Sequence, residues 1–99
     1  MEIINDWSDD LIMCPSQCFL SIENNQEQFT IYLRWRHCDP WTCQLVPSHN
    51  GKLNYDKDWI DVNINDFSHD ELEDAKKTAI ALTEKYFIEL ENKQKRINK

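Results

Sequence analysis

The chain has 99 residues, which suffice for one domain with a single core. Its one glycine and its eleven aromatic residues (four tryptophans, three tyrosines and four phenylalanines) exclude a disordered or low-complexity protein. The net charge is −7, no apolar run approaches the roughly 20 residues that span a bilayer, and the N-terminus lacks the features of a signal peptide, so we expect a cytoplasmic protein.

The negative charge is concentrated in residues 1–91, where seven basic residues stand against eighteen acidic ones for a net charge of −11. The last eight residues hold the other four of the eleven basic residues and no acid. Such a body repels a phosphate backbone, which argues against nucleic acid as the partner. The basic tail suits the last turn of a helix, where cations oppose the negative end of the helix dipole.

The N-terminal half of the chain predicts a β-hairpin. Residues 1–16 have no clear period, and the sequence leaves open whether they are structural or a docking arm. Residues 18–22 and 29–35 alternate between apolar and polar, as a half-buried antiparallel strand requires. If Asn25-Gln26 is a two-residue turn, the paired residues are Ile22 with Phe29, Leu20 with Ile31, Cys18 with Leu33 and Phe19 with Tyr32.

Further strands are predicted beyond residue 40. A third strand covers 41–46, the dipeptide Asn50-Gly51 is a strong type I′ hairpin signal, and a fourth strand covers 52–55. Residues 59–64 alternate again, either as a fifth short strand or as an extended lead-in to a helix.

The best-specified boundary is the start of a C-terminal helix. Ser68 can cap the helix, Glu71 completes a capping box, and Phe67 and Leu72 are spaced as a hydrophobic staple. We therefore predict a single α+β domain, in which an antiparallel β-meander of four to five strands is packed on one face by a long C-terminal α-helix. Its parts are an N-terminal segment over 1–16, the meander over 17–65 and the helix over 68–95.

The sequence offers one set of residues with metal-ligand chemistry: Cys14, Cys18, Cys38, Cys43, His37 and His49. The spacing of the cysteines falls loosely within the range for paired zinc ligands. However, Cys18 falls on the same side of its predicted strand as Leu20, and Cys43 falls on the same side as Leu45. This pattern favours two reduced, buried core thiols. We predict no metal site and no cofactor.

The sheet face away from the helix holds an aromatic strip edged by cations, because Phe19 is expected beside Tyr32 and Val46 beside Tyr55. Three interpretations remain open. Residues 1–13 could cover this face as a second small core. The face could be a protein interface, homodimeric or with another partner. It could also be a stacking platform for single-stranded nucleic acid.

The corner at residues 37–41 lies at the end of this face. Pro40 makes it rigid, and Asp39 could pair with Arg34 or Arg36 or accept hydrogen bonds as a turn residue. We expect a structural corner with the arginines stacked on Trp41 or Tyr32. A catalytic triplet of His37, Cys38 and Asp39 is disfavoured, because neighbouring residues of a strand face opposite ways. We therefore predict that the protein is not an enzyme.

The function that we predict is non-catalytic protein–protein interaction by a small acidic protein, with a protein partner or a second copy of the chain. The alternative is a single-stranded nucleic-acid-binding module that uses the same aromatic and arginine residues. We interpret the acid-rich stretch over 56–74 as a solvated surface, or as a patch that engages a basic partner by imitating a nucleic-acid backbone. Small acidic proteins of phages and mobile elements sometimes act in this way. The candidate binding residues are Phe19, Tyr32, Arg34, Arg36, His37, Asp39, Trp41 and Tyr55.

Overall fold

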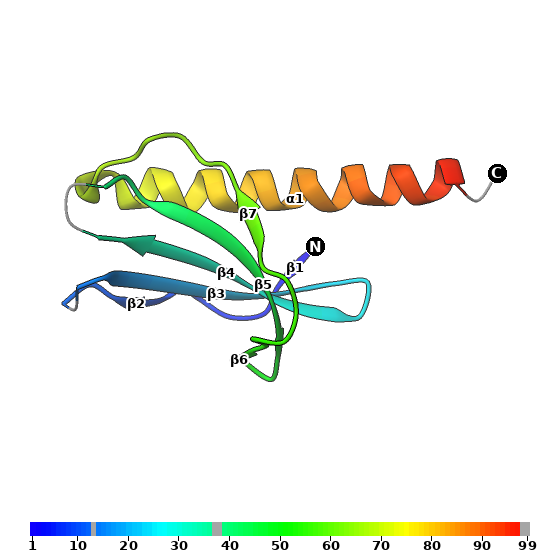
Figure 1. Cartoon of the computed structure of the whole chain (residues 1–99), viewed down its shortest axis with the longest axis horizontal. Helices are drawn as coiled ribbons and strands as arrows, with labels where there is room; N and C mark the ends of the chain where they lie inside the picture. Colours follow the sequence, from blue (N-terminus) through cyan, green and yellow to red (C-terminus); the bar gives the residue numbers. More distant parts are fainter. Residues whose placement is uncertain (13, 37–38, 98–99) are drawn as a thin grey trace.

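The computed structural model describes residues 1–12, 14–36 and 39–97. It shows an antiparallel sheet with one long C-terminal helix, α1, across one face (Figure 1), which confirms the predicted α+β fold. The described residues form seven strands, because two short N-terminal strands add to the four that the sequence predicts and to the short fifth strand that it leaves open. The strands are β1 (Glu2–Ile3), β2 (Ser8–Asp10), β3 (Ser16–Asn24), β4 (Glu27–Trp35), β5 (Thr42–His49), β6 (Lys52–Leu53) and β7 (Ile60–Val62).

The β3–β4 hairpin has the predicted register. Ile22 is opposite Phe29, Leu20 is opposite Ile31, and Cys18 is opposite Leu33. The two turn residues, Asn25 and Gln26, have φ angles of 52° and 69°. Positive φ at both central positions is the mark of a type I′ turn, whose twist matches that of the strands it joins.

Strand β5 turns at Asn50-Gly51, where φ is 52° and 79°, as the sequence predicts. The returning strand β6 ends at Leu53 rather than Tyr55, and the Asn54 N–H donates to the Pro47 carbonyl at 2.8 Å. Figure 1 shows β6 curling away from the side of the sheet that α1 covers. The fifth predicted strand forms as β7, which pairs with the first half of β5 through Cys43 and Val62.

The helix starts where the capping box predicts. A 3₁₀ turn, His69–Glu71, leads into α1, Leu72–Ile97. The Glu71 carboxylate accepts hydrogen bonds from both the backbone N–H and the hydroxyl of Ser68, each at 3.0 Å. No helix in the described part of the chain has the length and apolarity needed to cross a membrane. The buried core between sheet and helix consists of Cys18, Leu20, Ile22, Ile31, Leu33, Trp41, Cys43, Leu45, Ala75, Ala79 and Phe87.

The N-terminal segment lies along the edge of the sheet. Strand β1 pairs with the end of β3, and β2 pairs with its beginning. From this edge Asp9 reaches the helix, where its carboxylate lies 2.6 Å from Nζ of Lys76, and that ammonium also lies 5.4 Å from the ring centre of Trp7. Trp7 packs against the core on the helix side. Residues 1–10 therefore extend the sheet and do not form the cover over its second face that one interpretation of the sequence expected.

Candidate functional site

The face of the sheet opposite α1, here called the open face, is built from the side chains that alternate with the core. Along β3 and β4 the residues of the core side are Cys18, Leu20, Ile31 and Leu33. Their neighbours point the other way, because successive strand residues alternate between faces. The open face therefore carries Phe19, Ser21, Thr30, Tyr32, Arg34 and Val46.

One part of the open face is covered. Val46 is fully buried and Thr30 is 2% exposed, although neither faces the helix. The cover comes from the chain beyond β5: Gly51 and Leu53 line a groove of about 440 Å³ together with Phe19, Ser21 and Thr30. Further along, the ring of Trp59 lies 6.1 Å from that of Tyr32. Residues 51–59 thus occupy part of the position that the sequence analysis considered for residues 1–13.

A continuous series of partly or fully exposed rings, here called the aromatic row, runs from the sheet onto residues 51–59: Phe19, Tyr32, Trp59 and Tyr55. Phe19 meets Tyr32 edge to face at 4.9 Å, and Tyr55 lies 5.5 Å from Trp59. Residues 54–59, here called the crossing segment, connect β6 to β7. The Trp59 indole N–H donates to the Asn54 carbonyl at 3.2 Å, which ties the two ends of this segment together. Tyr55 remains 78% exposed. Burial raises the pKa of the Tyr32 hydroxyl, and the neighbouring Arg34 partly opposes that shift.

Trp59 is not among the predicted site residues. The alternation of residues 59–64 predicts either a fifth short strand or an extended lead-in to the helix, and neither places Trp59 on the open face. In the structure β7 begins only at Ile60, so Trp59 belongs to the crossing segment. The spacing of Tyr55 and Trp59 around the polar run Asp56-Lys57-Asp58 is the one sequence signal that could have indicated it.

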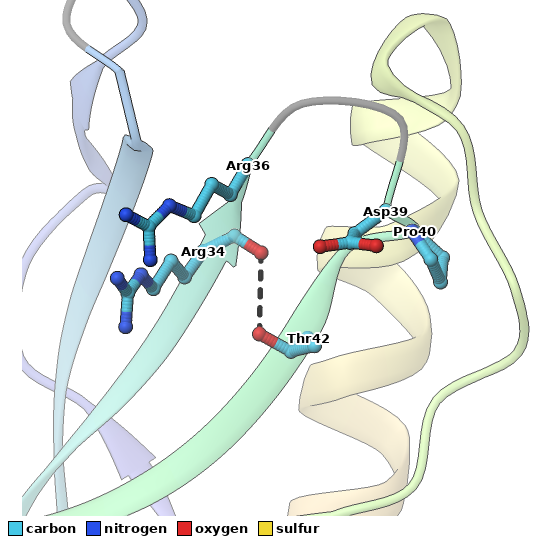
Figure 2. A pocket seen from close by; sticks show the side chains of 5 residues that line it. All are labelled: Arg34, Arg36, Asp39, Pro40 and Thr42. Atoms are coloured by element: carbon cyan, nitrogen blue, oxygen red, sulfur yellow. Dashed lines mark hydrogen bonds between the residues drawn. The ribbon is translucent and has the colours of Figure 1, made fainter.

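The end of the open face next to Tyr32 is formed by Arg34 and Arg36, here called the arginine pair. Both residues are exposed. Figure 2 shows their side chains extending in the same direction, away from Asp39, whose carboxylate lies between the end of β4 and the start of β5. With Pro40 and Thr42 they line a shallow pocket of about 200 Å³. Among the described residues neither guanidinium has a carboxylate within 4.0 Å, so the considered pairing with Asp39 does not form.

The backbone beneath the arginine pair is well anchored. The Asp39 N–H donates to the Arg36 carbonyl at 3.0 Å, which closes the corner as a turn. The Thr42 hydroxyl donates to the Arg34 carbonyl at 3.3 Å, which ties the start of β5 to the end of β4 (Figure 2). The two arginines thus project from a fixed base while their charged ends stay in solvent.

Trp41 does not belong to the open face, and its expected stacking with the arginines is wrong. It is 2% exposed and lies in the core under the start of the helix, where its backbone N–H donates to the Phe67 carbonyl at 2.9 Å. Its indole stacks on His69, with ring centres 6.0 Å apart and planes 13° apart. The parity shared with Cys43 already indicated this burial. His37 and Cys38 lie outside the described residues.

Two of the cysteines are unsuited to nucleophilic chemistry. Cys18 and Cys43 lie in the core, as their parity predicts, and burial raises the pKa of each thiol to about 12. Within the described ranges no group of three or more histidine, cysteine or acidic side chains is arranged to hold a metal ion. The acidic side chains of the stretch over 56–74 are all exposed: Asp56, Asp58, Asp61, Asp66, Asp70, Glu71, Glu73 and Asp74.

The arrangement on the open face is suited to recognition. The aromatic row provides rigid apolar contact area, and the arginine pair provides ten N–H donors in two planar forks. The groove beside Phe19 adds the polar side chains of Asn5 and Ser8 at the sheet edge. Comparison with known proteins adds no further assignment, since no family model, no curated protein and no solved structure matches this chain.

Proposed function

We propose that this protein is a non-catalytic interaction domain that binds a protein partner through the open face. The observation that carries the proposal is the position of the aromatic row beside two exposed arginines that have no ion-pair partner among the described residues. Tyr32 lies between the two sets, since its ring packs near those of Phe19 and Trp59 while Arg34 lies two residues further along β4.

These residue types favour binding for physical reasons. Tyrosine and tryptophan bury a large area at a low cost in side-chain entropy, and arginine combines charge with a planar surface. All three are enriched where interfaces are fully desolvated. The row also requires little ordering on binding, because Tyr32 and Phe19 belong to adjacent strands and a hydrogen bond anchors Trp59.

A second candidate is binding of single-stranded nucleic acid, for which exposed rings beside cations are a common platform. The exposed Tyr55 ring beside Trp59 is the observation in its favour. The net charge of −7 opposes it, since the body of the protein repels a phosphate chain. This candidate requires affinity for a thymidine oligonucleotide that falls steeply as salt rises.

The test is selection from a library of random linear peptides displayed on phage, with the purified protein as bait. We expect the selected peptides to bind the wild type and to lose binding to the variant Tyr32→Ala/Arg34→Ala. A milder variant, Tyr55→Ala, alters only an exposed ring and should weaken the same peptides without affecting the fold. Circular dichroism and thermal melting verify that each variant is folded.

The matched control is Lys85→Ala/Ile88→Ala, which also removes one cation and one exposed apolar side chain, but from α1. It should retain every peptide. Peptides that bind all variants equally would show that the interface lies elsewhere. Native mass spectrometry on the same samples measures self-association, and a dimer that only Tyr32→Ala/Arg34→Ala loses would identify a second copy as the partner.

A further inference from the structure

We propose that the arginine pair is a carboxylate-recognition site, so that the partner segment bound by the open face carries acidic side chains at alternate positions. This inference rests on the proposed function and specifies the chemistry of the partner. The occupant is an extended segment of another protein, with two aspartates or glutamates one residue apart and an apolar residue two positions before them.

The spacing comes from the end of β4. Tyr32, Arg34 and Arg36 alternate along the chain, and β4 ends at Trp35, between the two arginines. Alternate residues of a strand are separated by about 7 Å on one face, and the same spacing separates alternate side chains of an extended ligand. Both arginines line the same pocket, and Figure 2 shows their side chains extending in the same direction, which makes them accessible to one ligand.

The charge state of the pocket points to an anion. Arginine side chains in proteins carry a positive charge, and within the described ranges neither guanidinium is neutralised by an ion pair. A guanidinium fork fits a carboxylate with two parallel hydrogen bonds. The Asp39 N–H and the Thr42 hydroxyl donate to the backbone carbonyls of the pair and hold its base in place, so less freedom is lost when such a ligand binds.

Asp39 provides an internal check on this assignment. Its carboxylate lines the same pocket, although the side chains of the arginine pair extend away from it (Figure 2). Because like charges repel, this carboxylate weakens an anionic ligand and favours a neutral or cationic one. Asp39→Asn keeps the shape of the side chain and removes the charge. An anion site must therefore bind its ligand more tightly in that variant.

The overall charge favours a short acidic segment over a nucleic acid. Residues 1–91 carry −11, and a long phosphate chain would run beyond the arginine pair into this field. In a short segment with two carboxylates, both charges lie at the arginine pair. The acidic side chains more than about 8 Å away are then largely screened from them at physiological salt.

The test uses two C-terminally amidated peptides with the same uncharged fluorophore at the N-terminus, Leu-Ser-Glu-Ser-Glu and its neutral counterpart Leu-Ser-Gln-Ser-Gln, with fluorescence anisotropy as the readout. We expect the glutamate peptide to bind at least about tenfold more tightly than the glutamine peptide, since charged arginine–carboxylate hydrogen bonds are roughly twice as strong as neutral ones. The preference should shrink as salt rises.

Four variants assign the effect to the pocket. Arg34→Ala and Arg36→Ala should each weaken the glutamate peptide by about fivefold. Asp39→Asn should tighten it, by about twofold or more. The control Lys77→Ala/Lys85→Ala removes two charges from exposed positions of α1 and should leave the preference for glutamate unchanged.

The outcomes separate this inference from the proposed function. Equal binding of the two peptides, or no binding of the glutamate peptide, overturns the carboxylate assignment, while library peptides that depend on Tyr32 would still support the open face as the interface. A thymidine oligonucleotide that binds more tightly than the glutamate peptide and depends on both arginines also overturns it, in favour of phosphate. If no ligand of any kind depends on Tyr32, Arg34 or Arg36, both proposals are wrong.

Discussion

Nζ of Lys76 lies 2.6 Å from Oδ2 of Asp9, and this ion pair joins the helix α1 to the edge strand β2. The Lys76 side chain is 9% exposed and that of Asp9 is 31% exposed. Burial disfavours the ammonium, but the hydrogen bond and the charge of Asp9 outweigh it, so the pKa of Lys76 is raised. The N-terminal segment is therefore attached to the domain by an ion pair whose ammonium group is largely shielded from water.

Removing Asp9 should destabilise the protein more than removing Lys76. We expect Asp9→Ala to lower the free energy of unfolding by about 2 kcal/mol, because it leaves a buried ammonium without its partner. Lys76→Met should cost less, since the remaining carboxylate is partly hydrated. Glu73→Ala is the control: its carboxylate lies 3.7 Å from Lys76 but is largely exposed, so we expect less than about 0.5 kcal/mol. Urea denaturation measures all three, and equal effects of Asp9→Ala and Glu73→Ala would contradict the prediction.

The Cys43 thiol should make stability depend on pH in the alkaline range. Burial raises its pKa from 9.0 to about 12. When folding raises the pKa of a thiol, its contribution to stability is complete below the pKa of the unfolded state. That contribution is lost as the pH rises toward the pKa of the folded state. We therefore expect the advantage of the wild type over Cys43→Ala to shrink between pH 9 and pH 12 in denaturation experiments. An advantage that stays constant over this range would show that the thiol does not titrate as burial requires.

The capping box should contribute stability only when Glu71 is ionised. The hydrogen bonds from the backbone N–H and hydroxyl of Ser68 lower the pKa of this carboxyl from 4.5. When folding lowers the pKa of a carboxyl, its contribution to stability is complete above the pKa of the unfolded state. That contribution is lost as the pH falls through the pKa of the folded state. We expect Glu71→Gln to lower the melting temperature at neutral pH and to match the wild type well below pH 4.5. Thermal melts followed by circular dichroism test this, and a difference that persists in acid would rule out the ionic contribution.

The β3–β4 turn should be open to stabilisation at one position. Gln26 has a φ of 69°, a conformation that is strained for a residue with a Cβ atom and free for glycine. We expect Gln26→Gly to raise the free energy of unfolding by about 0.5–1 kcal/mol, since relief of this strain exceeds the added freedom of the unfolded chain. The reverse change in the other hairpin, Gly51→Ala, should lower it by about 1 kcal/mol, although no atom lies near enough to clash. Chemical denaturation that shows Gln26→Gly to be destabilising would refute the type I′ argument.

The elements predicted best are those specified by neighbouring residues. The register of β3 and β4 follows from an even turn and the alternation of Leu20 and Ile31, and the helix start follows from Ser68 and Glu71, which are three residues apart. Each of these features is determined by contacts within a few residues or across one short turn, so their patterns appear directly in the chain.

The candidate site was predicted in part. Phe19, Tyr32 and Arg34 do share one face, because parity along a hairpin requires it. At the corner the alternation of strand residues is interrupted, so the sequence assigned Trp41 both to the core and to the surface. In the structure Trp41 is buried beside His69. The place of Trp59 depends on how the chain returns after β6, which no local pattern records.

The β-hairpins, the helix start and the two faces of the sheet could be predicted from the chain alone, because alternation, turn chemistry and capping act over a few residues. Three features could not: β1 and β2 lie along the edge of β3, residues 51–59 return beside the open face, and Arg34 and Arg36 remain without an ion-pair partner among the described residues. These outcomes depend on which distant segments compete for the same hydrogen bonds and apolar surface, and that competition is settled by packing in three dimensions.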